Sequence, residues 1–209
     1  MVDHTIIQKY FNNFTDKQIE QFAFMFELYE TENAKVNVIS RKDMDNFYIH
    51  HVLHSLALVR FGDFSAAKTV VDIGTGGGFP GIPLAIIFPE IEFFLVDSIG
   101  KKIRVVQTIA NDLGLTNVVA TNARVESIPN KFDMAVARAV APSIELYHWM
   151  SKNWKNAPHF SLLKGGDLSS ELNDLIQLNS KLEIKVESIS SIYSEPFFDT
   201  KKVVNVNGR

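Results

Sequence analysis

Cysteine is absent from this chain of 209 residues, and long apolar runs are absent with it. Without cysteine the fold has no disulfide framework, no thiolate metal site and no cysteine nucleophile. No apolar run approaches the ~20 residues that a membrane span requires. The first residues, MVDHTIIQKYFNNF, have neither the basic start nor the apolar core of a signal peptide. We therefore expect a cytoplasmic protein without a membrane segment.

A strong charge of either sign is also missing. The formal net charge is −3, with 22% charged and 46% hydrophobic residues, which is typical of a soluble globular protein. This balance gives no support to nucleic-acid binding, but it does not exclude it, because a local basic patch is what meets phosphates. The length suits one domain with an extension, and 16 phenylalanines supply aromatic mass for its core.

The most informative stretch covers residues 69–97, TVVDIGTGGGFPGIPLAIIFPEIEFFLVD. A β-branched run leads into a glycine cluster, then an apolar segment with two early prolines, then a second apolar run that ends on Asp97. Glycines allow a sharp turn close to a ligand, and prolines at a helix start lose no helical hydrogen bond. An acid at the end of the second strand can accept hydrogen bonds from ribose hydroxyls. The order predicts the first half of a nucleotide-binding βαβ unit.

Two ligands compete for this unit. The pattern Gly76-x-Gly78-x-x-Gly81 satisfies the dinucleotide fingerprint, and Asp97 lies at about the ~20-residue spacing of the ribose-binding acid. An acid directly before the glycines, however, resembles S-adenosylmethionine enzymes of the Rossmann-like class. Such an acid suits a ligand with an ammonium group and repels a pyrophosphate. We therefore predict S-adenosylmethionine in preference to NAD, with a cofactor site that includes Asp72, Gly74, Gly76, Gly78 and Asp97.

Residues 1–64 are predicted to form a helical extension, and residues 65–209 the Rossmann-like domain. In the extension, apolar side chains recur at helical spacing after Thr15, which is in position to cap a helix, and again over residues 44–61. In the domain, helical segments alternate with predicted strands at 117–121, 132–137 and 160–163. Residues 182–192 and 201–206 are predicted to form the antiparallel pair that closes the sheet. The expected fold is therefore α/β, with helices on both faces of the sheet.

Three histidines, His50, His51 and His54, fall within five residues of each other. His50 and His54 are four apart and would share a helix face. No acid or further histidine at ligand spacing supports a metal site, so we expect none. A place on the surface or at an interface is one interpretation, and contact with cofactor or substrate is the other.

Basic residues gather where a parallel sheet binds its ligands, at the carboxyl ends of the strands. Lys101, Lys102 and Arg104 lie in the first turns of the helix after Asp97, where the helix N-terminus favours anions. Arg124 follows the next strand. A solvated basic face is the simpler interpretation, and contact with RNA phosphate is the functional one.

Arg138 ends the strand predicted at 132–137. Its position at the tip of a strand is solvent-facing, yet the rigid sheet holds it in place. We therefore favour a role in the site over a plain surface charge.

Several segments together resemble a known family. These segments are DIGTGGGFPGIPLAI, LVDSIGKKIR, RVES, FDMAVARAVA and LLKGG. They are similar to the bacterial ribosomal RNA methyltransferases that act on guanine N7 of the small subunit, also called glucose-inhibited division protein B. The segment NVISRKD…HHVLHSL resembles the N-terminal signature of that family, so the resemblance spans about residues 35–166. It implies S-adenosylmethionine as methyl donor and a guanine in the decoding-region loop of 16S rRNA as acceptor.

By position, the resemblance implies cofactor contacts from Gly74 and Phe79, with Val125 and Glu126 beside the adenine and Arg138 at the site. His54 stands where many members have an acid, so it is assigned no role. The C-terminus, VVNVNGR, follows the usual basic end only loosely, which leaves the part of the last strand open.

Guanine N7 has a lone pair and no proton, so its methylation requires no general base. The residues predicted to hold the base or its phosphate are Arg138, Lys164 and Arg124, the first two as catalytic residues. The missing cysteine excludes the usual covalent route to carbon-5 methylation of a pyrimidine. No Asn/Asp-Pro-Pro-aromatic tetrapeptide, expected of enzymes that methylate exocyclic amines, is found.

Two other functions stay open at this stage. One is an NAD-dependent oxidoreductase, for which no Tyr-x-x-x-Lys pair is found. The other is a non-catalytic assembly factor that binds S-adenosylmethionine and ribosomal RNA. The expected partner is 16S rRNA or the small ribosomal subunit, and nothing in the sequence requires more than a monomer.

Overall fold

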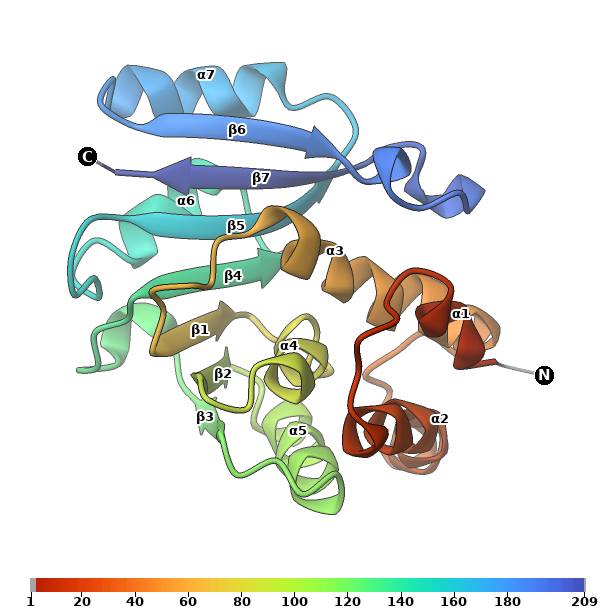
Figure 1. The fold of residues 1–209 in the computed structure, drawn as a ribbon. Coiled ribbons are helices and arrows are strands. Elements are labelled where there is room, and N and C mark those ends of the chain that lie inside the picture. Colours follow the sequence, from red (N-terminus) through yellow and green to blue (C-terminus); the bar gives the residue numbers. More distant parts are fainter. Residues whose placement is uncertain (1–2, 209) are drawn as a thin grey trace.

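The computed structural model describes residues 3–208, and a seven-stranded sheet forms its centre (Figure 1). The strand order is β3-β2-β1-β4-β5-β7-β6. The strands are β1 (Thr69–Ile73), β2 (Glu92–Asp97), β3 (Val118–Asn122), β4 (Met134–Arg138), β5 (His159–Gly165), β6 (Glu183–Ser188) and β7 (Lys201–Asn207). β1 to β5 are parallel, and β7 runs antiparallel to both β5 and β6. The Rossmann-like sheet with its closing antiparallel pair is confirmed.

Burial explains why the central strands are almost continuously apolar. In β1 and β4 nearly every residue is buried, because helices cover both faces of a parallel sheet. The outermost strands, β3 and β6, contain only exposed and half-buried residues, as is usual at the edges of a sheet. β6 ends at Ser188, earlier than predicted, because Ile189–Ser191 form a 3-10 turn.

The helices divide between the two faces of the sheet (Figure 1). They are α1 (Thr5–Gln8), α2 (Asp16–Lys35), α3 (His54–Phe61), α4 (Gly81–Ile87), α5 (Gly100–Asp112), α6 (Ser143–Trp149) and α7 (Ser169–Leu178). One apolar cluster joins α2 to α5 with one face of the sheet, and a second joins α6 and α7 with the other. Helices on both faces, as predicted, are therefore confirmed. None of the helices within residues 3–208 is long and apolar enough to cross a membrane.

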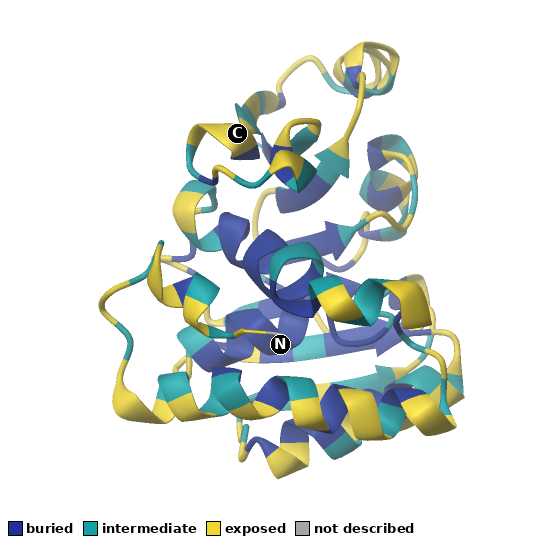
Figure 2. Ribbon diagram, turned by 90° about the vertical axis from the view of Figure 1, so that its right-hand side faces the viewer, coloured by how far each residue is buried: buried dark blue, intermediate teal, exposed yellow. Residues whose placement is uncertain are grey.

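The N-terminal helices share the first apolar cluster with the sheet. Thr15 caps α2 in a capping box with Gln18, which confirms the predicted helix start. Figure 2 shows buried residues through the middle of the molecule and exposed residues on the outward faces of its helices. α3 lies in this middle and contacts α4, β5 and β7. The proposed division between residues 64 and 65 stays a prediction.

The predicted helix over residues 44–61 is wrong in its first half. A 3-10 segment covers Arg41–Asn46 and a π-helical segment covers Phe47–Leu53, and only α3 is α-helical. Within the π-helical segment, the adjacent His50 and His51 both form hydrogen bonds with Asp43. Apolar spacing did not reveal the change of helix type.

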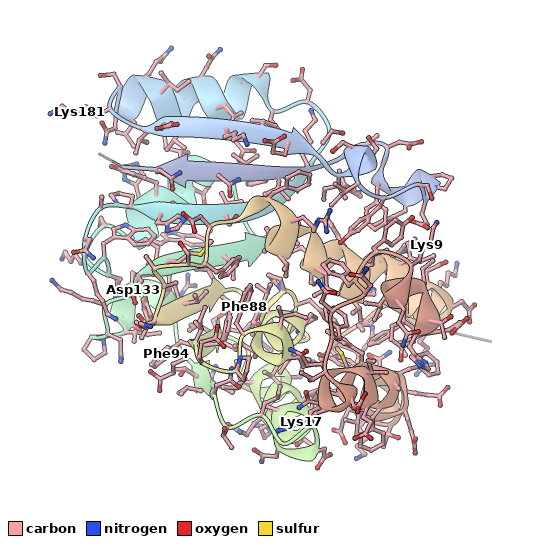
Figure 3. All side chains as sticks on the ribbon, in the orientation of Figure 1. Lys9, Lys17, Phe88, Phe94, Asp133 and Lys181 are labelled. Carbon is pink, nitrogen blue, oxygen red and sulfur yellow. The ribbon has the colours of Figure 1, made fainter. Side chains whose placement is uncertain are left out.

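At the amino ends of the central strands, hydrogen bonds of Asp133 link β1 to β4. Figure 3 labels Asp133, which directly precedes β4. Its carboxylate accepts hydrogen bonds from the backbone N–H groups of Lys68 (3.0 Å) and Thr69 (2.8 Å) and from Lys155 Nζ (3.0 Å). These bonds hold the starts of β1 and β4 together. The carboxyl ends of the same strands are left free to carry a site.

Candidate active site

A cavity of about 400 Å³ opens at the carboxyl ends of β1, β2 and β4 and beside the loop after β3. This is the edge where open α/β sheets bind ligands, and the volume lies in the usual range for small-molecule sites. The predicted site residues that line the cavity are Gly74, Gly76, Phe79, Asp97, Lys102, Arg124, Val125, Glu126 and Arg138. Those that do not line it are Asp72, Gly78, Lys101, Arg104 and Lys164.

The glycine loop after β1 forms one wall and needs its glycines. Gly74 has φ +63°, and a Cβ there would lie 2.8 Å from both methyl groups of Val140. Gly76 has φ +58° and faces open space, where a Cβ would meet only the Gly74 carbonyl oxygen at 3.9 Å. Other side chains rarely adopt this backbone conformation. The loop therefore offers bare backbone to a ligand, which fits an adenosine-type cofactor.

Asp97 ends β2 at the cavity wall. Its Oδ2 accepts a hydrogen bond from Gly76 N at 3.0 Å, and its Oδ1 accepts one from Ile99 N at 2.8 Å. A carboxylate oxygen has two lone pairs, so each still has room for a ligand hydroxyl. Asp97 thus holds the glycine loop in place and can bind a ribose at the same time.

Asp72 does not contact the cavity, contrary to its predicted role. It is fully buried beneath the loop, where its Oδ2 accepts hydrogen bonds from Thr75 Oγ1 (2.6 Å) and Gly81 N (2.9 Å). Its Oδ1 has no hydrogen-bond partner. Burial raises the pKa of Asp72 to about 7. The residue supports the loop from inside and places a titrating acid beneath it.

Gly78 also lies away from the cavity. Its Cα faces the interior, where a Cβ would lie 2.7 Å from Ile82 Cγ1 and 2.9 Å from Tyr29 Oη. The geometry therefore gives Gly78 a packing role, and a contact of Gly78 with the cofactor stays a prediction.

The cavity wall beside β3 is formed by a short 3-10 turn, Val125–Ser127. Val125 is buried and apolar, and Glu126 is exposed at the rim. An apolar surface next to a hydrogen-bonding group suits a purine base. A place beside the adenine stays the prediction that the resemblance implies for these two residues.

Arg138 ends β4 and lies over the ring of Phe79, with the guanidinium carbon 5.1 Å from the ring centroid. Its Nη1 donates hydrogen bonds to the His50 carbonyl oxygen (3.2 Å) and to His51 Nδ1 (3.1 Å). Burial lowers the pKa of Arg138 to about 10, so the side chain remains a cation at neutral pH. The sheet and the N-terminal segment together fix this residue.

Asp43 and His51 complete the arrangement, and sequence reasoning did not assign either to the site. Asp43 Oδ2 lies 2.6 Å from His51 Nε2, and Oδ1 bonds His50 Nδ1. Arginine only donates hydrogen bonds, so His51 Nδ1 accepts from Arg138 and the His51 proton resides on Nε2. Burial, together with the charge of Arg138, lowers the pKa of His51 to about 4, so its imidazole is neutral. The available sequence signal was the cluster of histidines.

That histidine cluster is not arranged as a metal site. In the part of the chain that the structure describes, no three His, Asp or Glu side chains are grouped to hold a metal ion. His50 stacks on Phe197, with ring centroids 3.9 Å apart. His54 is buried.

The predicted basic residues separate into three groups. Lys102 and Arg124 line the cavity, whereas Lys101 and Arg104 are exposed on the outer side of α5. Lys164 does not reach the cavity, since its Nζ donates to the Ala141 carbonyl oxygen and pairs with Glu171, each at 2.7 Å. This ion pair fixes the side chain elsewhere, so Lys164 is not kept among the catalytic residues.

Tyr29 anchors α2 to the glycine loop, because its buried Oη donates to the Gly77 carbonyl oxygen at 2.6 Å. Replacing Tyr29 by Phe leaves this carbonyl without its partner, so we expect a loss of about 1–2 kcal/mol in the free energy of unfolding. The loosened loop should also bind S-adenosylhomocysteine, the form of the predicted cofactor without its methyl group, several-fold more weakly. Urea unfolding and titration calorimetry measure the two effects.

Tyr48→Phe is the matched control for this prediction. Tyr48 is also buried, and it donates to the Phe22 carbonyl oxygen at 2.8 Å, without a contact to the loop. It should lose similar stability and keep its affinity for S-adenosylhomocysteine. Equal affinities in the two variants would contradict the role given to Tyr29.

Two solved structures share this fold at low sequence identity. The magnesium protoporphyrin IX methyltransferase (ChlM) of Synechocystis PCC 6803 with bound SAM matches with a TM-score of 0.59 at 16% identity, over 95% of this chain and all of that one. A SAM-dependent methyltransferase from Aquifex aeolicus matches with a TM-score of 0.58 at 16% identity, over 77% of this chain and 92% of that one. These likenesses establish the fold.

Relatives and a family model define the family. The chain is 49% identical to ribosomal RNA small subunit methyltransferase G of Bacteroides thetaiotaomicron, over 95% of this chain and 97% of the relative. It is 46% identical to the protein of the same name from Christiangramia forsetii, over 95% and 94%. The family model described as GidB, rRNA small subunit methyltransferase G, matches residues 18–199.

The match extends well beyond the motifs that suggested it. It confirms the predicted resemblance and the predicted class of enzyme, an S-adenosylmethionine-dependent rRNA methyltransferase. The alternative of an NAD-dependent oxidoreductase is therefore excluded. The chain belongs to the GidB family, rRNA small subunit methyltransferase G.

Proposed function

We propose that this chain transfers the methyl group of S-adenosylmethionine to N7 of a guanine in the decoding-region loop of 16S rRNA, as a monomer in the cytoplasm. The observation that carries the proposal is the cavity at the carboxyl edge of the sheet, in a chain whose family match covers residues 18–199. The fold alone serves many reactions, so the family match supplies the acceptor.

The residues of the cavity fit the cofactor. Asp97 would hold the ribose, the backbone at Gly74 and Gly76 would approach the methionine part, and Val125 would pack on the adenine. When bound, S-adenosylmethionine supplies an electrophilic methyl group on a cationic sulfur. These residue roles are proposals that rest on cavity position and hydrogen-bonding capacity.

The reaction requires positioning and no proton transfer. The N7 lone pair would form the new bond to the methyl carbon, and the electrons of the carbon–sulfur bond would leave with sulfur. The chain's task is to align the two reactants, and proximity of this kind supplies a large part of many rate enhancements. The site must also accept a positive charge that moves from sulfur to the base.

The basic residues near the cavity would meet the RNA. The target base is expected to leave its stack to reach the methyl group, as is usual for chemistry on a base. Lys102 and Arg124 line the cavity and would contact the phosphates beside that base. Lys101 and Arg104 are exposed on the same helix as Lys102 and would extend this contact.

Mass mapping of 16S rRNA from cells with and without this gene tests the function. We expect one 7-methylguanosine to be lost without the gene and to be restored by the wild-type chain but not by Gly74→Asp. An aspartate at position 74 would be strained at φ +63° and would collide with Val140, which would block the cofactor loop.

Gly114→Asp provides the matched control. Gly114 has nearly the same backbone angle, φ +65°, but a Cβ there meets nothing within 4 Å and lies outside the cavity lining. This variant should restore the modification. An unchanged methylation map after loss of the gene would overturn the proposal and would favour the non-catalytic assembly factor.

A further inference from the structure

The Arg138 guanidinium is held by protein on one side and has donors to spare on the other. Among the described residues, its hydrogen bonds both leave from Nη1, toward His50 O and His51 Nδ1, and Phe79 supports the plane of the group. Within residues 3–208, Nε and Nη2 have no protein acceptor, and the side chain lines the cavity. Several N–H groups of this cation are therefore available to a ligand.

The orientation of that cation depends on Asp43 acting through His51. The only arrangement of protons that satisfies all three groups has Arg138 donating to His51 Nδ1 and His51 Nε2–H donating to Asp43. Ionised Asp43 selects the tautomer that accepts from Arg138. In the opposite tautomer, His51 Nδ1–H would face the Nη1–H of Arg138, and the two donors would repel each other.

Strand order indicates which part of a bound cofactor would lie nearest Arg138. The cavity follows the edge β3, β2, β1, β4, with Asp97 at the end of β2. If Asp97 binds the ribose, the apolar wall at Val125 beside β3 takes the base. The amino-acid part must then extend over β1 toward β4. Among the described residues that line the cavity, Arg138 is the cation on that side, since Lys102 and Arg124 lie on the other.

We infer that Asp43 and His51 are positioning residues that aim Arg138 at the α-carboxylate of the cofactor. The inference rests on the proposed function and deepens it. Arginine matches a carboxylate with two parallel hydrogen bonds, which is a strong and directional contact. The other familiar two-bond partner of arginine, the O6/N7 edge of guanine, is unsuitable here, because such a contact would occupy the lone pair that must attack the methyl group.

Calorimetric titration with two ligands tests the inference: S-adenosylhomocysteine and its decarboxylated analogue, which lacks only the α-carboxylate. His51→Ala should raise the Kd of S-adenosylhomocysteine by about 10-fold and leave the Kd of the analogue unchanged. His51→Asn should recover most of the loss, because the amide oxygen replaces Nδ1 and accepts from Arg138. His51→Gln reaches toward Asp43 instead and should not recover it.

His50→Ala is the matched control. It removes the other hydrogen bond to Asp43 and the stacking on Phe197. It leaves both partners of Arg138, the backbone carbonyl of residue 50 and His51 Nδ1, in place. Both of its Kd values should stay at those of the wild type.

A purely structural role for His51 would weaken both ligands equally or would lower only the unfolding midpoint, and either result would overturn the inference. If His51→Ala does not fold, the Asn and Gln variants carry the test: equal Kd values in these two would also overturn it. The inference can fail while the proposed function stands. This is the case if the wild-type chain binds S-adenosylhomocysteine and methylates rRNA, but the His51 variants do not show the selective loss of affinity. A wild-type chain that binds neither ligand would contradict the proposed function itself.

Discussion

Replacing Arg138 by alanine is expected to lower kcat/KM for S-adenosylmethionine in rRNA methylation by about 100-fold or more. The guanidinium is the cation at the β4 end of the cavity, and burial makes its contacts with a charged ligand stronger than they would be in water. The same change removes the partner of His51 Nδ1 and should cost only about 1–3 kcal/mol of unfolding free energy. Steady-state kinetics and urea unfolding separate the two effects.

Arg138→Lys is the companion variant. It keeps a positive charge but loses the planar fork and the stacking on Phe79, so it should recover only part of the activity. An alanine variant that methylates rRNA at the wild-type rate would show that Arg138 has no part in the site. Full recovery by lysine would show that charge alone is needed.

The predicted site residues that line the cavity are fixed by their own local chain. The β-branched run before Gly74, the glycine turn and the acid at Asp97 each follow from rules that act over a few residues. Arg138 was placed in the same way, as the last residue of a strand. Local rules locate the edge of the sheet and the order of the strands, and the cavity lies at that edge.

The site residues that sequence reasoning missed contact partners that lie far away in the sequence. His51 and Arg138 are 87 positions apart, and the contact requires the π-helical segment to pass beside the end of β4. Nothing in the local pattern at Asp43 distinguishes it from a surface acid. Lys164 was misplaced for the same reason, because its partner Glu171 belongs to another element and removes it from the site.

Asp72 was misplaced for a simpler reason, the alternation of side chains along a strand. Val70 and Asp72 are two residues apart and point to the same face of β1, and Val70 belongs to the cluster that packs under α4. The motif gives the position of the acid in the sequence but does not say which way it faces. Because helices cover both faces of β1, a side chain on either face is buried, and alternation places Asp72 on the face of Val70.

Replacing Asp72 by asparagine is expected to make the chain progressively more stable, relative to wild type, as pH rises from about 4 to 8. Burial raises the pKa of Asp72 from 3.8 to about 7, so the folded state binds this proton more tightly than the unfolded state does. The stability that the protonated acid contributes is therefore complete below pH 4 and is lost as pH rises through 7. Asparagine keeps an oxygen for Thr75 and Gly81 and does not titrate.

Over the roughly three pH units between the two pKa values, the difference in unfolding free energy should change by on the order of 4 kcal/mol. Urea unfolding of both chains across this range measures it. Asp133→Asn is the control of opposite sign, since its hydrogen bonds, from Lys155 first, outweigh burial and lower the pKa of Asp133. That variant should lose stability at neutral pH. Parallel pH profiles for wild type and Asp72→Asn would show that Asp72 does not titrate in the folded chain.

The same substitution should also change how the affinities for S-adenosylmethionine and S-adenosylhomocysteine depend on pH. S-adenosylmethionine carries a sulfonium charge that S-adenosylhomocysteine lacks, and an ionised Asp72 beneath the glycine loop favours the cation. The wild-type affinity for S-adenosylmethionine should therefore rise with pH through 7, and its affinity for S-adenosylhomocysteine should rise less. In Asp72→Asn this difference should disappear. If it does, an acid that never touches the cofactor makes the site prefer the methyl donor to the product, because a buried charge acts over a longer distance than a hydrogen bond.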